Sequence, residues 1–420
     1  MTSRTLALRR ALRKLGPGLI TGAADDDPSG IATYSQAGAQ FGFGMLWTVV
    51  ITLPLMVAIQ TVSARIGYVS RRGVAANIRE AYPRWVLLCV VGLLVTANTL
   101  NIAADIAAMA GALRILLGGS AHVYAVTFGT TCLLLQIFVP YRAYVRTLKW
   151  FTLALLAYVA VAFSVKLDWI SVLHDAVLPS IALTKETLLM VVAIFGTTIS
   201  PYLFFWQAAQ EMEEARDERP RREQEVRQHL RRIKVDTLIG MTFSNLVAFF
   251  IILSTGATLH MSGITDIQTS TQAAQALRPV AGEFAFLLFG IGIIGTGMLA
   301  IPVLAGSAGY AVAEAAGWRG TLSARLDRGE GRGFYGIIAA ATLGGVGLCF
   351  TPWDPVKELF WCAVLNGVVA VPIMVIIMLL ASRTATMRGH TIGRRLRVMG
   401  WIATGAMGLT VLAMLATLWR

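Results

Sequence analysis

Charged residues are scarce in this sequence. They make up 14 % of its 420 residues, whereas apolar residues make up 56 %. A soluble domain of average composition carries about 25 % charged residues. A chain so poor in charge cannot cover a water-soluble fold with polar side chains, and its apolar residues fall in runs long enough for membrane-spanning helices. The composition therefore predicts an all-α integral membrane protein without a separate soluble domain.

Side chains that carry enzyme chemistry are also few. The chain holds four cysteines and five histidines, with no Cys-x-x-Cys and no His-Glu-x-x-His pattern among them. Its glycine-rich stretches are not followed by the Gly-Lys-Ser/Thr of a phosphate-binding loop. We therefore expect neither an enzyme nor a nucleotide-driven pump, and we predict no cofactor.

The long apolar runs define the predicted membrane spans. A helix needs about 20 mostly apolar residues to cross the roughly 30 Å of hydrocarbon in a bilayer. Eleven runs meet this requirement: 17–41, 45–64, 85–113, 121–140, 145–165, 187–209, 235–258, 277–301, 334–351, 357–381 and 399–419. The segment 71–83 between two of them reads as a short amphipathic helix on the cytoplasmic surface.

The basic residues predict the orientation of these spans. With the N-terminus in the cytoplasm, 30 of the 36 Lys and Arg residues lie on the cytoplasmic side. This asymmetry follows the positive-inside rule, and it predicts an N-terminus inside and a C-terminus outside. The net charge of +13 is then explained by the anionic inner leaflet rather than by nucleic acid. We expect a multi-pass protein of the plasma (inner) membrane of a prokaryote.

Two of the predicted spans are interrupted by proline beside polar residues. The first span contains residues 22–30 (Gly-Ala-Ala-Asp-Asp-Asp-Pro-Ser-Gly), and the sixth contains residues 196–202 (Gly-Thr-Thr-Ile-Ser-Pro-Tyr). Proline removes a backbone donor and disrupts the preceding turn. A broken helix inside a bilayer is tolerated where it lines a cavity, and carboxylates at that depth indicate a functional site. The alternative is that both prolines only kink their helices.

The spacing of the two breaks predicts a repeat. They lie five spans apart, and an odd offset inverts the second unit relative to the first, as in transporters whose substrate binds at broken helices near the membrane midplane. We predict a single transporter domain over 1–420, with repeat one at about 17–165, repeat two at about 187–381 and an additional helix at about 399–419.

Several motifs resemble those of the NRAMP divalent-metal transporters. Asp27-Pro28-Ser29-Gly30 is similar to the family's first-helix Asp-Pro-Gly-Asn, and residues 73–83 are similar to its cytoplasmic segment. Further similarities are Gly16-Pro17-Gly18, Asp105, Gly111, Asn245, Leu365-Asn366-Gly367 and Pro372. The resemblance implies the LeuT-like fold, a 5+5 inverted repeat with discontinuous helices 1 and 6, and transport of divalent cations.

The departures from the family pattern indicate a subgroup. The usual sixth-helix Met-Pro-His-Asn is Ser200-Pro201-Tyr202-Leu203 here, which removes the metal-binding thioether and the histidine of the proton path. Gly30 replaces an asparagine ligand, and Ala108 replaces the acidic partner of Asp105. These features resemble the NRAMP-related magnesium transporters. A soft thioether favours softer metals, so its loss leaves hard oxygen ligands, and the smaller side chains leave volume for the waters that Mg²⁺ retains.

The candidate metal site follows from this resemblance. Asp27 is the predicted carboxylate ligand, with a helix cap as its alternative role; the carbonyl of Thr197 is carried over from the family. Ser200 would bind the cation through water or would only be a small residue that leaves space. Gly30, in place of the family's asparagine ligand, would leave volume for water.

The pathway candidates are Asp25, Asp26, Tyr202, Gln207 and Asp105. Asp25 and Asp26 would ring the vestibule or cap the half-helix, and Gln207 would line the pathway or bond to a neighbouring helix. Asn98, Asn101 and Asp105 share one helix face. This polar face would either line the transport pathway or form hydrogen bonds to neighbouring helices. Gln60, Asn245 and Asn366 are predicted to form hydrogen bonds between helices.

The sequence thus predicts transport of Mg²⁺, with Mn²⁺ as a further candidate, by alternating access without proton coupling. A proton-coupled Mn²⁺ or Fe²⁺ importer of the main NRAMP type is the alternative. The expected partners are the cation and the lipid bilayer, without nucleic acid, nucleotide or an obligate protein. The charged segment Glu211–Lys234 reads as a solvated helical extension of the sixth span, with a regulatory partner site as its alternative.

Overall fold

The computed structural model describes residues 17–139, 144, 148, 150–179, 184–217, 223–318, 320–322, 331–352 and 354–418, and every regular element within them is a helix. Among the described residues, eight helical segments are long and apolar enough to cross a membrane, and two shorter apolar segments lie at Phe151–Ser164 and Arg332–Leu348. The protein is therefore a multi-pass helical membrane protein, as the composition predicts. The count of eleven spans stays a prediction.

The unbroken helices follow the predicted apolar runs. They are α4 (Leu46–Ser70), α6 (Arg84–Leu117), α7 (Ala121–Phe138), α13 (Glu223–Thr258), α16 (Ala285–Ala316), α17 (Arg332–Leu348), α18 (Pro355–Ser382) and α19 (Arg394–Leu418). The fifth predicted span contains η1 (Phe151–Leu155) and α9 (Leu156–Ser164), whereas 145–147 and 149 lie outside the described residues. The basic N-terminal segment 1–14 also lies outside them.

Both predicted helix breaks are present. The first span divides into α2 (Pro17–Asp25) and α3 (Pro28–Phe41), and the sixth into α11 (Lys185–Thr198) and α12 (Pro201–Asp217). Pro28 and Pro201 each occupy the first position of the second half-helix, where a missing backbone N–H costs no hydrogen bond. The prolines therefore begin new helices instead of only kinking continuous ones.

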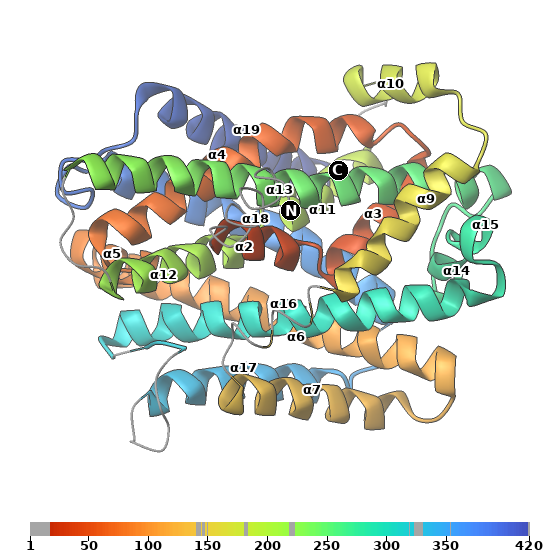
Figure 1. Cartoon of the computed structure of the whole chain (residues 1–420), viewed down its shortest axis with the longest axis horizontal. Helices are drawn as coiled ribbons and strands as arrows, with labels where there is room; N and C mark the ends of the chain where they lie inside the picture. Colours follow the sequence, from red (N-terminus) through yellow and green to blue (C-terminus); the bar gives the residue numbers. More distant parts are fainter. Residues whose placement is uncertain are drawn as a thin grey trace, which may run out of the picture.

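Helices from the two predicted repeats pack against each other in pairs. In the centre of the bundle α4 packs on α12, α13 packs on α2 and α3, and α6 packs on α16 (Figure 1). Gly22 faces the backbone of Gly240, and Gly67 faces the carbonyl of Ala208, both at distances that leave no room for a Cβ atom. Small residues at such crossings let membrane helices approach closely. The broken helices are thereby held between long, continuous ones.

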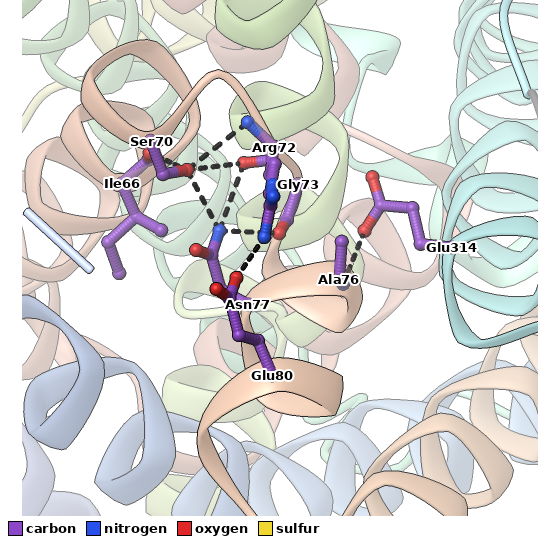
Figure 2. Close-up of polar contacts among 8 residues, drawn as sticks. All are labelled: Ile66, Ser70, Arg72, Gly73, Ala76, Asn77, Glu80 and Glu314. Carbon is purple, nitrogen blue, oxygen red and sulfur yellow. Dashed lines mark hydrogen bonds and ion pairs between the residues drawn. The ribbon is translucent and has the colours of Figure 1, made fainter. Parts of the chain in front are cut away.

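The predicted amphipathic helix is α5 (Val74–Ala81). Asn77 donates from Nδ2 to Ser70 Oγ at 2.9 Å and to the Gly73 carbonyl at 2.8 Å, which fixes the turn after α4 (Figure 2). Glu314 at the end of α16 accepts a hydrogen bond of 3.1 Å from the backbone N–H of Ala76 (Figure 2). A carboxylate at a helix N-terminus stabilises the helix. Through these contacts α5 is held against the end of α4 on one side and the end of α16 on the other.

The prediction of a wholly solvated segment at Glu211–Lys234 is wrong in part. Its described parts are the end of α12 and the start of α13, whereas 218–222 lie outside the described residues. Glu211 and His229 are only 2 % and 3 % exposed. His229 Nε2 lies 3.3 Å from Glu211 Oε2, and Tyr68 stacks on its ring with centroids 3.9 Å apart. The two helices pack through this pair, which charge composition alone does not reveal.

The remaining short helices connect the long ones. They are α10 (Trp169–Val177), η2 (His260–Ser262), α14 (Ser270–Gln275), α15 (Arg278–Ala281) and η3 (Gly282–Phe284). Gln36 on α3 accepts from the backbone of Ile267 at 2.8 Å, and His260 Nδ1 lies 2.8 Å from the carbonyl oxygen of Ala39. These contacts hold the connection after α13 against the end of α3.

Candidate metal site

Asp27 lies in the break between α2 and α3 and is 1 % exposed. Its Oδ1 accepts a hydrogen bond of 2.7 Å from the backbone N–H of Gly30, so the side chain caps α3. Its Oδ2 accepts from the Tyr202 hydroxyl at 3.4 Å. The cap, which sequence reasoning treated as an alternative to a ligand, uses one oxygen and leaves the other facing the second broken helix.

Hydroxyl groups satisfy the carbonyls that the two breaks release. Ser200 donates from Oγ to the Thr197 carbonyl at 2.7 Å or the Gly196 carbonyl at 2.9 Å. The Tyr202 hydroxyl donates to the carbonyl oxygen of Ala24, at the end of α2, over 3.2 Å. A carbonyl has two lone pairs, so the Thr197 oxygen can still accept one further partner. Ser200 thus has a defined structural role beside the water-mediated one predicted for it.

The space beside Gly30 is smaller than the open volume that the sequence predicts. A Cβ atom on Gly30 would lie 3.1 Å from Thr197 Oγ1, 3.3 Å from Tyr34 Cε2 and 3.4 Å from Asp27 Oδ1. The volume expected to hold water is therefore closely bounded by these three side chains. The hydroxyls of Thr197 and Tyr34 are buried and have no hydrogen-bond partner among the described residues. Thr197 faces the site with its side chain as well as its backbone.

Asp25 and Asp26 take neither of the roles predicted for them. They are 1 % and 2 % exposed, so they do not ring an open vestibule, and the cap of α3 is Asp27. Ser244 on α13 lies with its Oγ 2.6 Å from Asp25 Oδ2 and 3.0 Å from Asp26 Oδ1. Within the described part of the chain, the second oxygen of each carboxylate has no hydrogen-bond partner.

The polar face of α6 divides into two parts. Asn98 donates from Nδ2 to the Leu304 carbonyl at 2.8 Å and to Ser307 Oγ at 2.7 Å, so it joins α6 to α16. One and two turns further on, Asn101 and Asp105 are fully buried, and their side-chain polar atoms have no hydrogen-bond partner among the residues described. Interhelical bonding therefore explains Asn98 but not Asp105.

The other predicted polar residues mostly join helices. Gln207 donates to Thr237 Oγ1 at 2.9 Å, Asn245 to the Val49 carbonyl at 2.7 Å, and Gln60 to the Leu203 carbonyl at 2.8 Å. The prediction of such a bond fails for Asn366, whose amide is buried without a partner in the described part of the chain.

Within the described part of the chain, four interior carboxylates therefore have no cationic partner. Asp25, Asp26, Asp27 and Asp105 are each at most 2 % exposed, and none takes part in the ion pairs formed between described residues. Burying an unpaired charge is costly unless a cation or a proton compensates it. The donors are carboxylate, hydroxyl and carbonyl oxygens, which are the ligands of hard divalent cations.

Several cavities lie beside this site at the end predicted to face outside. The largest of these has a volume of about 560 Å³, and its lining includes Arg114, His122, Asp354 and Glu358. A smaller cavity of about 20 Å³ is lined by residues that include Ile31, Ser35, Ala108 and Leu359. At the other end, the bond between Gln207 and Thr237 and the contact between Gly22 and Gly240 close the packing. The carboxylates are thus buried, and the cavities that share residues with α3 and α6 lie on the predicted outer side.

Sequence reasoning missed two members of this cluster. Tyr34 lies seven residues after Asp27, so helical spacing could have placed it on the face of α3 that meets the break. Ser244 carries no such signal, because its role depends on how α13 packs against α2.

Comparison with known proteins agrees with this geometry. The sequence profile of the natural resistance-associated macrophage protein-like family matches residues 18–417. The chain is 28 % identical over 311 residues to a divalent metal cation transporter MntH of Aeromonas hydrophila, covering 71 % of this chain and 72 % of the relative. It is also 28 % identical over 306 residues to MntH of Pectobacterium carotovorum, covering 71 % of each.

Solved structures share the fold at low sequence identity. A manganese transporter of Eremococcus coleocola, in complex with an aromatic bis-isothiourea substituted compound, superposes with a TM-score of 0.75 at 18 % identity, covering 95 % of this chain and 85 % of that one. Mhp1, a nucleobase-cation-symport-1 family transporter, gives a TM-score of 0.60 at 12 % identity, covering 96 % and 92 %. A Na⁺-coupled sialic acid symporter gives 0.58 at 13 %, covering 95 % and 89 %. The chain has the LeuT-like fold with discontinuous helices 1 and 6, and it belongs to the NRAMP family.

Proposed function

We propose that this protein transports divalent metal cations across the inner membrane by alternating access, with Mg²⁺ as its principal substrate and Mn²⁺ as a further one. The observation that carries the proposal is the group of four buried carboxylates around the break of helix 1, none of which forms an ion pair with another described residue. A divalent cation would compensate their charge, and the relatives named MntH are divalent metal cation transporters.

The preference for a hard cation rests on the donor atoms. All the candidate ligand atoms are oxygens: Asp27 Oδ2, the Thr197 hydroxyl and carbonyl, and one carboxylate oxygen each of Asp25 and Asp26. Ser200 stands where the family resemblance would place a thioether. Mg²⁺ is commonly held by one or two carboxylates while it keeps several waters. Binding of a hydrated ion would require the close contacts around Gly30 to open, as expected of a carrier that changes conformation.

Membrane potential can drive this transport without protons. A divalent ion moving into a negative interior gains about 4.6 kcal/mol per 100 mV, from about 2.3 kcal/mol per unit charge. The alternative, a proton-coupled Mn²⁺ or Fe²⁺ importer, would need a chain of titratable groups from the site to the cytoplasm. Three residues disfavour this alternative. Ser200 stands in place of the thioether of that type, Tyr202 in place of the histidine, and Ala108 in place of the acidic residue.

Uptake into proteoliposomes tests the proposal. Mg²⁺, Mn²⁺ and Ca²⁺ would each be offered under an inside-negative potential, with and without a pH gradient. We expect saturable Mg²⁺ uptake that follows the potential and is nearly indifferent to the pH gradient. Uptake of Mn²⁺ alone, driven by the pH gradient, would favour the proton-coupled importer instead.

A further inference from the structure

A groove on the surface of the bundle combines an apolar lining with a cluster of positive charge. It lies between α4, α13 and α19 and has a volume of about 640 Å³. Its apolar lining includes Leu53, Val57, Leu238, Leu396 and Met399. The same groove is lined by four cationic side chains and by no acidic one; the cations are Arg65, Lys234, Arg394 and Arg395.

The cations gather at one end of the groove. On α4, Arg65 is the last groove residue and Leu53 the first; on α13, which runs the opposite way, Lys234 precedes Leu238. On α19, Arg394 and Arg395 precede Leu396 and Met399. All three helices therefore place their positive charge at the end that the basic residues predict to be cytoplasmic.

The length of the groove matches one leaflet of a bilayer. Leu53 and Arg65 are twelve residues apart on α4, which is about 18 Å along a helix axis. The hydrocarbon core of a bilayer is about 30 Å thick, so the groove extends over roughly half of it. An acyl chain would lie along the apolar part while its headgroup stayed at the membrane surface.

The positive charges are available for a headgroup. None of the four cations has an acidic partner among the residues described, and the Arg65 Nε atom is buried there without a hydrogen-bond acceptor. Arginine presents a planar fork of donors that matches phosphate, and basic pockets between membrane helices at the cytoplasmic side bind anionic lipid headgroups.

We propose that this groove is a binding site for one anionic phospholipid of the inner leaflet, with its phosphate held by Arg65, Lys234, Arg394 and Arg395 and its acyl chains along α4, α13 and α19. The site adjoins the transport machinery, because α4 packs on α12 and α13 packs on α2 and α3. A bound lipid would hold together the helices that support the two broken ones. The inference does not depend on which cation is transported.

Native mass spectrometry of the full chain in detergent tests the site. The protein is titrated with phosphatidylglycerol or phosphatidylcholine, and the wild type is expected to retain phosphatidylglycerol preferentially. Each basic residue near an anionic headgroup contributes about a fivefold gain in binding. The double variant Arg65→Gln/Arg395→Gln should therefore bind phosphatidylglycerol about 25-fold more weakly, while its binding of phosphatidylcholine changes little.

A matched variant controls for surface charge in general. Arg231→Gln/Arg388→Gln removes two exposed charges from the same predicted side outside the groove and should leave the lipid preference unchanged. Val57→Trp narrows the apolar part and should weaken lipid binding with all four cations in place, and inorganic phosphate should not displace the lipid. Wild-type preference in the groove variant, an equal loss in the control, or displacement by inorganic phosphate would each overturn the proposal.

Discussion

The hydroxyl of Tyr202 lies 3.4 Å from Oδ2 of Asp27. This contact joins the two broken helices at the point where both unwind, since Asp27 precedes α3 and Tyr202 is the second residue of α12. The same hydroxyl is 3.2 Å from the Ala24 carbonyl oxygen. Tyr202 thus stands where the family resemblance would place a histidine, and it holds the candidate ligand by a hydrogen bond.

Removing this hydroxyl should weaken transport moderately. Tyr202→Phe deletes one hydrogen bond to Asp27 or Ala24 while keeping the ring, and such a bond contributes about 0.5–1.5 kcal/mol. We expect initial Mg²⁺ uptake to fall by about two- to tenfold, with the pH dependence of uptake unchanged. Uptake rates between pH 6 and pH 8 check this. A complete loss of transport, or an altered pH profile, would give Tyr202 a role in proton movement.

Cation uptake should not acidify the vesicle lumen. Tyrosine has an unperturbed pKa of about 10, and alanine cannot titrate, so Tyr202 and Ala108 cannot replace the family's relay. Asp105 remains, without its acidic neighbour. A pH-sensitive dye trapped in proteoliposomes should record no change during Mg²⁺ uptake. Stoichiometric proton movement would contradict this expectation and favour the manganese-importer alternative.

The close packing of α2 on α13 should not tolerate a methyl group. Gly22→Ala would place a Cβ atom against the backbone of Gly240, and overpacking of this kind costs about 1–3 kcal/mol. Gly92→Ala is the matched control, because nothing lies within 4 Å of its added Cβ, and it should stabilise α6 by about 0.5–1 kcal/mol. Thermal unfolding in detergent compares the two. Equal melting temperatures would show that α2 is not held against α13.

The predicted orientation can be tested by cysteine labelling. The four native cysteines are free and would first be replaced. A membrane-impermeant maleimide applied to whole cells should label Met261→Cys, which is 70 % exposed in the wild type. It should label Gln228→Cys only after the cells are opened. The reverse pattern would invert the topology.

The sequence was sufficient to predict both helix breaks. Pro28 and Pro201 stand beside polar residues and begin new half-helices, whereas the prolines within apolar runs, Pro54, Pro302 and Pro372, lie inside continuous helices. Asp27 before Pro28 also caps the next half-helix. The amphipathic pattern of residues 71–83 likewise predicted the short helix α5. Features of this kind depend on neighbours along the chain, so they can be derived without the fold.

Contacts between distant segments were not predictable in this way. Ser244 reaches Asp25 only because α13 packs on α2. Glu211 lies beside His229 through a contact between α12 and α13, which are separate helices. The space beside Gly30 was expected to be open, but Thr197 and Tyr34 bound it. Each of these depends on helix packing, which residue types alone do not specify.

The measurement that tests the account most directly is Mg²⁺ uptake by Asp27→Asn in proteoliposomes. Asparagine caps a helix about as well as aspartate, so the fold should persist while the charge is lost. Asp168→Asn, the same change at the exposed cap of α10, is the control. We predict that uptake falls about 100-fold or more in Asp27→Asn, as for loss of about 3 kcal/mol of charged interaction, and stays unchanged in the control. Wild-type uptake by a correctly inserted Asp27→Asn protein would contradict the account.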